Sequence, residues 1–113
     1  MKRLLMAAVS AAALAVAGTA SAQDAKIEKG IKVYADQKCG VCHSIDGKGN
    51  AKGPLDSVGL KLSADDAREW IVHPAEMTKK TKAERKPLMR AYPNLAKDDL
   101  DAVVAYMLSL KKK

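Results

Sequence analysis

The stretch Cys39-Gly40-Val41-Cys42-His43 constrains the fold of this chain more than any other feature of its sequence. Cys-x-x-Cys-His is the attachment sequence for c-type haem: two thiols bond to the vinyl groups of the porphyrin, and the adjacent histidine binds the iron. Residues three apart lie on the same face of a helical turn, so Cys39 and Cys42 can grip one porphyrin while His43 points at its centre. The motif therefore predicts one covalent haem c held by these three residues.

Two other kinds of site also use a Cys-x-x-Cys pair. A redox disulfide of the thioredoxin type lies at the start of a helix in a strand-rich unit, and no strand pattern precedes Cys39. A tetrahedral zinc site needs four ligands, and Cys39, Cys42, His43 and His73 are all the cysteines and histidines of the chain. Their spacing is unlike that of the zinc fingers, so the haem interpretation is favoured over both alternatives.

Residues 1–22 have the pattern of a secretory signal peptide. Lys2 and Arg3 form a basic start, residues 4–17 are apolar or small apart from one serine, and Ala20-Ser21-Ala22 is a small-residue cleavage site. The apolar run is shorter than the roughly 20 residues that a bilayer span needs, which makes an uncleaved anchor the weaker alternative. We therefore expect cleavage after residue 22, export to the periplasm without stable membrane insertion, and a single domain over residues 23–113.

The composition indicates a small core that needs a large apolar group. The chain has no Phe and one Trp, and residues 23–113 suffice for one small domain only. Domains of this size usually need a staple such as a metal or a disulfide. A disulfide between Cys39 and Cys42 would close too short a loop to constrain the unfolded chain much. A covalently held porphyrin would supply the missing flat apolar volume.

The charge balance is basic. The net charge is +7 at pH 7 and falls to +5 once Lys2 and Arg3 are removed. This lysine-rich excess predicts acidic protein partners, whereas nucleic acid is not expected because no recognition motif accompanies the charge. Residues 78–90 carry six basic side chains against Glu84. Such a run is usually a solvated surface, and it becomes a docking patch if it lies near an exposed haem edge.

Apolar spacing predicts three helices, over residues 24–38, 63–73 and 98–111. Ser63 is expected to cap the second helix and Pro74 to end it. The apolar faces consist of Ile27, Ile31 and Tyr34 in the first helix and Leu100, Val103, Val104, Met107 and Leu110 in the last. Because no strand pattern and no internal repeat accompany them, the fold class is expected to be all-α.

The segment between the first two helices is rich in glycine and is expected to form a loop around the proximal side of the haem. A haem-ligating histidine is normally oriented by an acceptor on its second ring nitrogen, and the Gly53-Pro54 turn is the natural source of a carbonyl for His43. Trp70 is expected to point toward the core or the haem edge, where its indole N–H can donate to a haem propionate.

A second axial ligand must come from Met77, Met89, Met107 or His73. Met107 belongs to the apolar face of the last helix, where a methionine is usually core filling. His73 would give a less common bis-histidine site. Met77 and Met89 both lie in sequence that reads as loop, and the prolines at 87 and 93 hold the Met89 segment stiff. Met89 is therefore the preferred sixth ligand and Met77 the alternative.

With these residues assembled, residues 23–113 resemble the small soluble class I cytochromes c. The resemblance implies an all-α cytochrome c fold, with three main helices and loops wrapped around one haem. It also implies that the Pro54 carbonyl accepts the proton of His43, that Met89 is the sixth ligand, and that Trp70 lies by a propionate. The motifs that carry it are Gly30-x-x-x-Tyr34, Cys39-x-x-Cys42-His43, Gly53-Pro54, Met89 and Val103-x-x-Tyr106.

In that family the first and last helices cross each other. The first helix contributes a Gly and an aromatic residue to the crossing, and the last helix contributes an apolar residue and a Tyr. The resemblance would therefore pack Gly30 and Tyr34 against Val103 and Tyr106. Two departures from the family pattern stand out. Leu55 follows Pro54 directly, so that either Leu55 or Val58 is left to form the haem wall, and Met89 precedes Arg90 where the family usually has proline.

The expected function is that of a monomeric periplasmic one-electron carrier that is not an enzyme and that exchanges electrons with acidic reductases or oxidases. One rival is a haem sensor, in which a small gas displaces Met89. A peroxidase is disfavoured because His73 would be alone as a distal acid or base. A haem subunit of a larger oxidoreductase is the third alternative.

Overall fold

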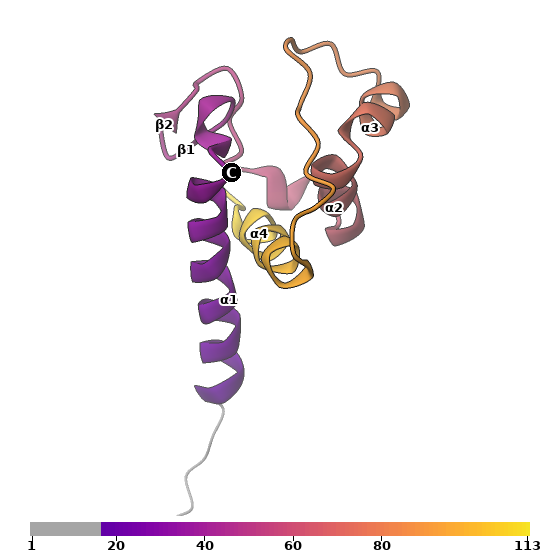
Figure 1. Ribbon diagram of the computed structural model, residues 1–113. Helices are drawn as coiled ribbons and strands as arrows, with labels where there is room; N and C mark the ends of the chain where they lie inside the picture. Colours follow the sequence, from indigo (N-terminus) through magenta and orange to yellow (C-terminus); the bar gives the residue numbers. More distant parts are fainter. Residues whose placement is uncertain (1–16) are drawn as a thin grey trace, which may run out of the picture.

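The computed structural model describes residues 17–113, which form a mostly helical fold (Figure 1). The helices are α1 (Ala17–Asp36), α2 (Ala64–Val72), α3 (Pro74–Thr81) and α4 (Lys97–Ser109). Two 3₁₀ turns, η1 (Cys39–Val41) and η2 (Val58–Leu60), and a short antiparallel hairpin of β1 (Ser44–Ile45) and β2 (Lys48–Gly49) complete the described elements. The all-α class is thereby confirmed.

The predicted signal peptide is covered only at its end. Residues 1–16 lie outside the described residues, and residues 17–22 form the first turns of α1. Cleavage after residue 22 therefore stays a prediction. Within residues 17–113, none of the helices combines the length and the apolar character needed to cross a membrane.

The longest helix, α1, crosses α4 at Gly30. A Cβ at Gly30 would collide with the carbonyl oxygen of Ala102 and would lie 2.7 Å from the Cβ of Tyr106. One turn further along α1, the ring of Tyr34 meets that of Tyr106 edge to face, with centroids 5.8 Å apart and an interplanar angle of 89°. Val103 is buried at the same crossing. The expected packing of the first helix on the last is confirmed.

The second predicted helix is confirmed as α2. The prediction of three helices is wrong, because residues 17–113 contain a fourth helix, α3. Ser63 caps α2, accepting a hydrogen bond of 3.1 Å on its hydroxyl from the backbone N–H of Asp66. Pro74 ends α2 as expected and also opens α3, which the sequence did not predict. A proline suits the first turn of a helix, because its φ is already helical and its missing N–H would have no partner there.

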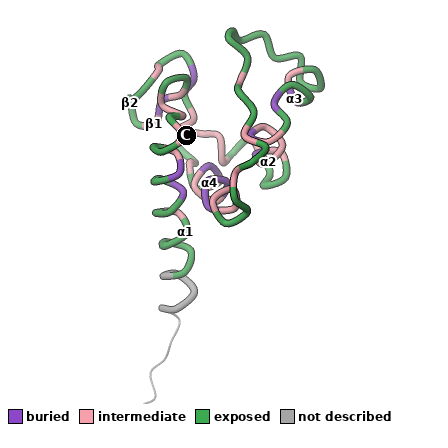
Figure 2. The backbone as a smooth tube through the Cα atoms, in the orientation of Figure 1, coloured by how far each residue is buried: buried purple, intermediate pink, exposed green. Residues whose placement is uncertain are grey.

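The core is thin and comes from three helices. Figure 2 shows buried residues in α1 and α4, where the two helices face each other, and exposed residues over much of the remaining chain. No large side chain among the described residues is completely buried. The buried cluster consists of Val33, Ala67, Ile71, Val103, Val104 and Met107. Such a core leaves room for a further apolar group, as the composition predicts.

Candidate functional site

A cavity of about 600 Å³ lies between the Cys-x-x-Cys-His segment and the segment that joins α3 to α4. Figure 1 places these two segments on either side of α4, so residues more than 40 positions apart face one space. Its lining is mainly apolar, and its volume falls in the range of about 300–1,000 Å³ that is typical of cofactor sites. The cavity therefore has the size and polarity to hold a large flat ligand.

The two cysteines of the motif line this cavity as free thiols. Cys39 is the first residue of the one-turn helix η1 and Cys42 follows its last residue, and the backbone N–H of Cys42 donates to the carbonyl of Cys39 over 3.1 Å. This turn brings both residues to the same wall. Cys42 is exposed and Cys39 is partly buried, and burial raises the pKa of the Cys39 thiol.

His43 lies on the same wall and is held in one orientation. Its Nδ1 donates to the carbonyl of Gly53 over 3.1 Å, which leaves Nε2 with a free lone pair. Burial is the main reason why the pKa of His43 is lowered from its ordinary value, and the charge of Arg85 lowers it further. The hydrogen bond to Gly53 raises the pKa but does not offset burial, so the site favours the neutral ring, which is the form that binds a metal.

The acceptor for His43 corrects the role that the resemblance implied for Pro54. An isolated parallel bridge pairs Ser44 with Pro54, and in such a bridge the groups that face Ser44 belong to the residues flanking the proline. Accordingly, the N–H of Ser44 donates to Gly53 over 3.0 Å and the N–H of Leu55 donates to the carbonyl of Ser44 over 2.9 Å. The carbonyl of Gly53, and not that of Pro54, points at the histidine, and Pro54 does not line the cavity.

The four candidates for a second axial ligand are separated by their positions. Met89 lines the cavity from the segment between α3 and α4. Met77 does not line it, because it is buried within α3 and not in a loop as expected. Met107 reaches the cavity from α4 as part of the buried cluster. His73 is half exposed, bonds Glu69 and lies outside the cavity. Met89 packs against the buried cluster without belonging to it, and it is thus the candidate outside the cluster that shares the cavity with His43.

Two hydrogen bonds of Tyr92 hold the segment that carries Met89 to α2 and to the residue that follows α1. The backbone N–H of Tyr92 donates to the carbonyl of Ile71 over 2.9 Å, and its hydroxyl donates to the carbonyl of Gln37 over 3.3 Å. Arg90 lies over the Tyr92 ring at 5.1 Å and donates to its hydroxyl over 3.2 Å. Sequence reasoning missed Tyr92, because no spacing rule connects it with a residue at the end of α1.

Arg85 links the two walls of the cavity. It lines the cavity from the segment after α3, and its Nη2 donates to the carbonyl of Cys42 over 2.6 Å. The guanidinium also packs against Gly53. The sequence showed Arg85 only as one of several basic residues between 78 and 90, so this contact was not predicted.

The remaining expected residues also lie at the cavity. Trp70 of α2 lines it. The sequence left open whether Leu55 or Val58 forms the wall, and both residues line the cavity. Tyr34 also lines it, and its hydroxyl is buried without a hydrogen-bond partner among the described residues. Burial raises the pKa of Tyr34 to about 12.

These observations fit a haem c. The cavity brings together two free thiols, an oriented neutral imidazole and a thioether, with mainly apolar walls around them. Sulfur from methionine and nitrogen from histidine are the axial donors of a six-coordinate haem iron. The residues present are therefore those that a covalently attached porphyrin requires.

Comparison with known proteins also points to a haem c protein. The model of the family described as cytochrome c matches residues 27–111. A cytochrome c oxidase subunit 2 from Alkalihalophilus pseudofirmus is 28% identical over 92 residues, which cover 74% of this chain and 25% of that protein. The chain thus spans about a quarter of the length of this curated relative. No solved structure matches the chain.

Proposed function

The chain belongs to the cytochrome c family, as a class I c-type cytochrome, and from this membership we propose that it is a periplasmic one-electron carrier with a single haem c ligated by His43 and Met89. Membership of the family indicates a haem protein of electron transfer. The observation that carries the finer proposal is that His43 and Met89 line one mainly apolar cavity beside Cys39 and Cys42.

Each residue of the site has a distinct task in this proposal. The thiols of Cys39 and Cys42 hold the porphyrin covalently, and His43 binds the iron through Nε2 while Gly53 fixes the ring. Met89 would supply the second protein ligand to the iron, which would leave no open position for a substrate. When bound, haem supplies an iron that gains or loses one electron without bond making at a substrate. The thioether and the apolar walls favour the reduced state and raise the reduction potential.

The lining of the cavity supports a carrier over a peroxidase. Its residues include no carboxylate, and His43 is the one histidine among them. A distal acid–base pair would need titratable groups on the Met89 side of the cavity, where the charged side chains that line it are arginines. We therefore propose that the protein is not an enzyme by itself.

Basic side chains at the cavity support acidic redox proteins as partners. Lys38, Arg85 and Arg90 line the cavity, and the lysines between residues 79 and 86 are exposed on the adjoining segment. Charges of one sign around the site of electron exchange steer an oppositely charged partner, and such steering weakens as salt rises. The docking patch left open by the sequence is accordingly part of this proposal.

The likeness to a cytochrome c oxidase subunit 2 favours one second candidate. The chain covers a quarter of that protein, so it corresponds to a part of a longer oxidoreductase subunit. We propose as the alternative that the protein acts as a haem subunit of a larger oxidoreductase. Co-purification of the chain with a membrane oxidase would favour this alternative, and recovery as a free monomer in the periplasm would favour the carrier.

The ligand assignment is tested by absorption spectra of the oxidised and reduced protein. An iron–thioether bond gives a weak far-red band in the oxidised form, and we expect Met89→Ala to abolish this band and to let the reduced protein bind carbon monoxide. Met77→Ala is the matched control, since Met77 lies in α3 away from the cavity, and it should keep the band. A wild-type protein that lacks the band and binds carbon monoxide would instead be a sensor.

A further inference from the structure

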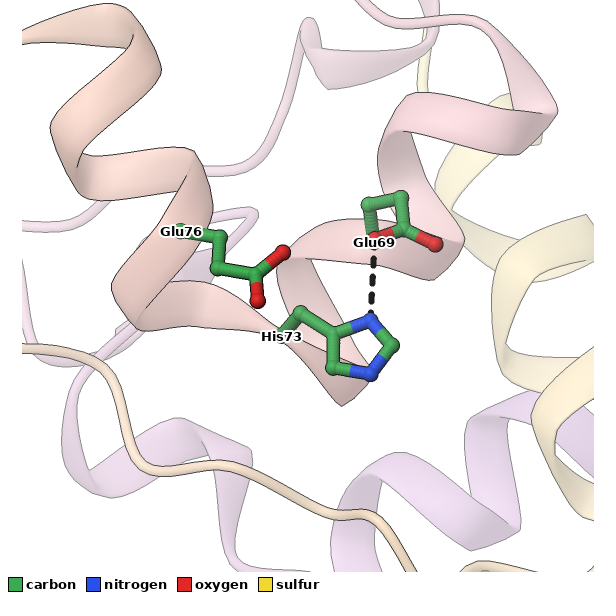
Figure 3. A group of neighbouring side chains, drawn as sticks. All are labelled: Glu69, His73 and Glu76. Atoms are coloured by element: carbon green, nitrogen blue, oxygen red, sulfur yellow. Dashed lines mark hydrogen bonds and ion pairs between the residues drawn. The ribbon is translucent and has the colours of Figure 1, made fainter.

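A cluster of metal-binding side chains lies outside the haem cavity, where α2 meets α3. It consists of Glu69, His73 and Glu76 (Figure 3). The Nδ1 of His73 lies 2.9 Å from a carboxylate oxygen of Glu69, and one donor atom from each of the three residues lies within 4.8 Å of the others. All three side chains are exposed, so an ion can reach them from solvent.

The chain brings these residues together through the corner at Pro74. Glu69 and His73 are four apart and share one face at the end of α2. Pro74 opens α3 directly after His73, and Glu76 belongs to the first turn of this second helix. Figure 3 shows the carboxylate of Glu76 turned toward His73 from α3. The third donor thus comes from a different helix than the first two.

The donor set selects the class of ion. Imidazole nitrogen and carboxylate oxygen are ligands of zinc, with bonds of about 2.0–2.2 Å. Calcium and magnesium prefer oxygen ligands alone, so the histidine argues against them. Two ligands at such bond lengths lie roughly 3 Å apart, close to the 2.9 Å between Glu69 and His73. Glu76 is exposed, and its donor atom lies within 4.8 Å of those of the other two residues.

The surroundings leave these donors available. Among the ion pairs of residues 17–113, Glu69 pairs with His73 alone and Glu76 takes part in none. His73 and Glu76 also lie at the rim of a hollow of about 310 Å³, whose other walls are mainly apolar. Met89 lines both this hollow and the haem cavity. Two residues of the cluster therefore face the Met89 segment across this hollow and lie outside the haem cavity.

We propose that Glu69, His73 and Glu76 form a surface site for a divalent transition-metal ion, with Zn²⁺ as the preferred probe. The protein supplies three ligands and water fills the remaining positions. The site is separate from the haem ligands, so it does not depend on the assignment of Met89. By tying the end of α2 to the first turn of α3, the ion stabilises the corner on which one side of the Met89 segment rests.

Isothermal titration of the oxidised haem-loaded protein with Zn²⁺ tests this proposal. We expect one ion per chain with a dissociation constant in the micromolar range, and no binding of Mg²⁺. His73→Gln and Glu76→Gln should each weaken Zn²⁺ binding at least tenfold. Glu84→Gln is the matched control, because it removes the same charge from an exposed acid just beyond α3 and should leave the affinity unchanged.

The absorption spectrum recorded during the titration separates this site from the haem. We expect the haem spectrum to keep its axial-ligand bands while Zn²⁺ binds. The proposal is overturned if Zn²⁺ does not bind at millimolar concentration, or if His73→Gln binds it as tightly as the wild type. It is equally overturned if binding removes the far-red band, since the ion would then be competing for a haem ligand.

Discussion

Gly30 lies where the backbone of α1 is too close to α4 to leave room for a Cβ, and it gives the first prediction. In Gly30→Ala the new methyl would meet the Ala102 carbonyl, which is backbone and cannot turn aside. Alanine favours a helix by about 1 kcal/mol over glycine, but overpacking costs about 1–3 kcal/mol, and the collision with backbone decides the sign. We expect a net loss of stability in urea denaturation.

A second substitution on the same helix controls for helix propensity. Glu28→Ala changes an exposed position of α1 and should leave the unfolding midpoint almost unchanged. If Gly30→Ala is as stable as Glu28→Ala, then the two helices can move apart freely and the close approach at Gly30 is not a constraint.

Tyr34 gives a prediction on pH dependence. Its pKa is raised from 10.0 to about 12 in the fold by burial, so the folded protein holds a proton that the unfolded chain releases above pH 10. Stability from this group is complete below pH 10 and is lost as the pH rises toward 12. Tyr34→Phe removes this loss, and at pH 7 it also removes a buried hydroxyl without a partner.

Urea denaturation of wild type and Tyr34→Phe at pH 7 and at pH 11 measures both effects. The variant should be at least as stable as the wild type at pH 7, and its advantage should grow at pH 11. A variant that is clearly less stable at pH 7 would mean that the hydroxyl has a partner in the haem-loaded protein.

For single residues, the sequence predicted which side chains lie together within one turn, but it did not predict which backbone carbonyl faces the histidine. The spacing of Cys39, Cys42 and His43 placed all three on one wall, because that spacing is within a single turn. The acceptor for His43 lies 10 residues away, and its identity depends on which carbonyl of an extended segment faces inward. The direction of the Gly53 carbonyl is set by the bridge between Ser44 and Pro54, and no sequence pattern predicts this bridge.

Among the elements, the segment between α3 and α4 contains no helix or strand, so its position depends on hydrogen bonds such as those of Tyr92. Tyr92 fastens it to the end of α1 through its hydroxyl. On the proposed ligation of the iron by Met89, we expect Tyr92→Phe to keep the fold but to release Met89 at a lower urea concentration, since one of the hydrogen bonds that hold the segment is lost. The far-red band of the oxidised protein reports this release.

Tyr106→Phe makes the same chemical change on α4, where the ring contact with Tyr34 is retained. It should leave the urea midpoint of the far-red band near that of the wild type. Equal midpoints for Tyr92→Phe and Tyr106→Phe would show that the hydroxyl of Tyr92 does not hold the Met89 segment.

α2 and α4 were predictable from their apolar spacing, whereas α1 was predicted only in part and α3 was not predicted. α1 begins at Ala17 instead of residue 24, and Ile31 of its expected apolar face is 47% exposed while Val33 is buried. α2 and α4 begin and end within two residues of the expected limits. Residues 74–81 contain mostly polar side chains and follow a proline, so their pattern indicated a charged surface run. The helix forms there because Pro74 has a helical φ at the first position, and because Glu76 in the first turn and Lys79 and Lys80 in the last turn have the charges that the helix dipole favours.

For the whole molecule, dependence on the cofactor follows from how much apolar surface packs against other helices and how much faces the cavity. α1 and α4 pack on each other directly, whereas much of the apolar surface of α2 and of the Met89 segment faces the cavity of about 600 Å³. No large side chain of the described residues is completely buried. A domain of this size has little stability beyond what its core supplies, so the porphyrin must complete that core.

The haem-free chain is therefore expected to be largely unfolded. The double variant Cys39→Ala and Cys42→Ala, produced without a haem supply, removes the covalent group while changing only two small side chains at the cavity wall. Its far-ultraviolet circular dichroism should show much less helix than the haem-loaded wild type, with no cooperative thermal transition. Because α1 and α4 bury surface directly against each other, any helix that persists should belong to this pair, and hydrogen exchange should protect the amides near Gly30 and Ala102 ahead of those in α2. Native-like helix content with a sharp transition would mean that the helices alone make a sufficient core, and that haem is carried by the fold without completing it.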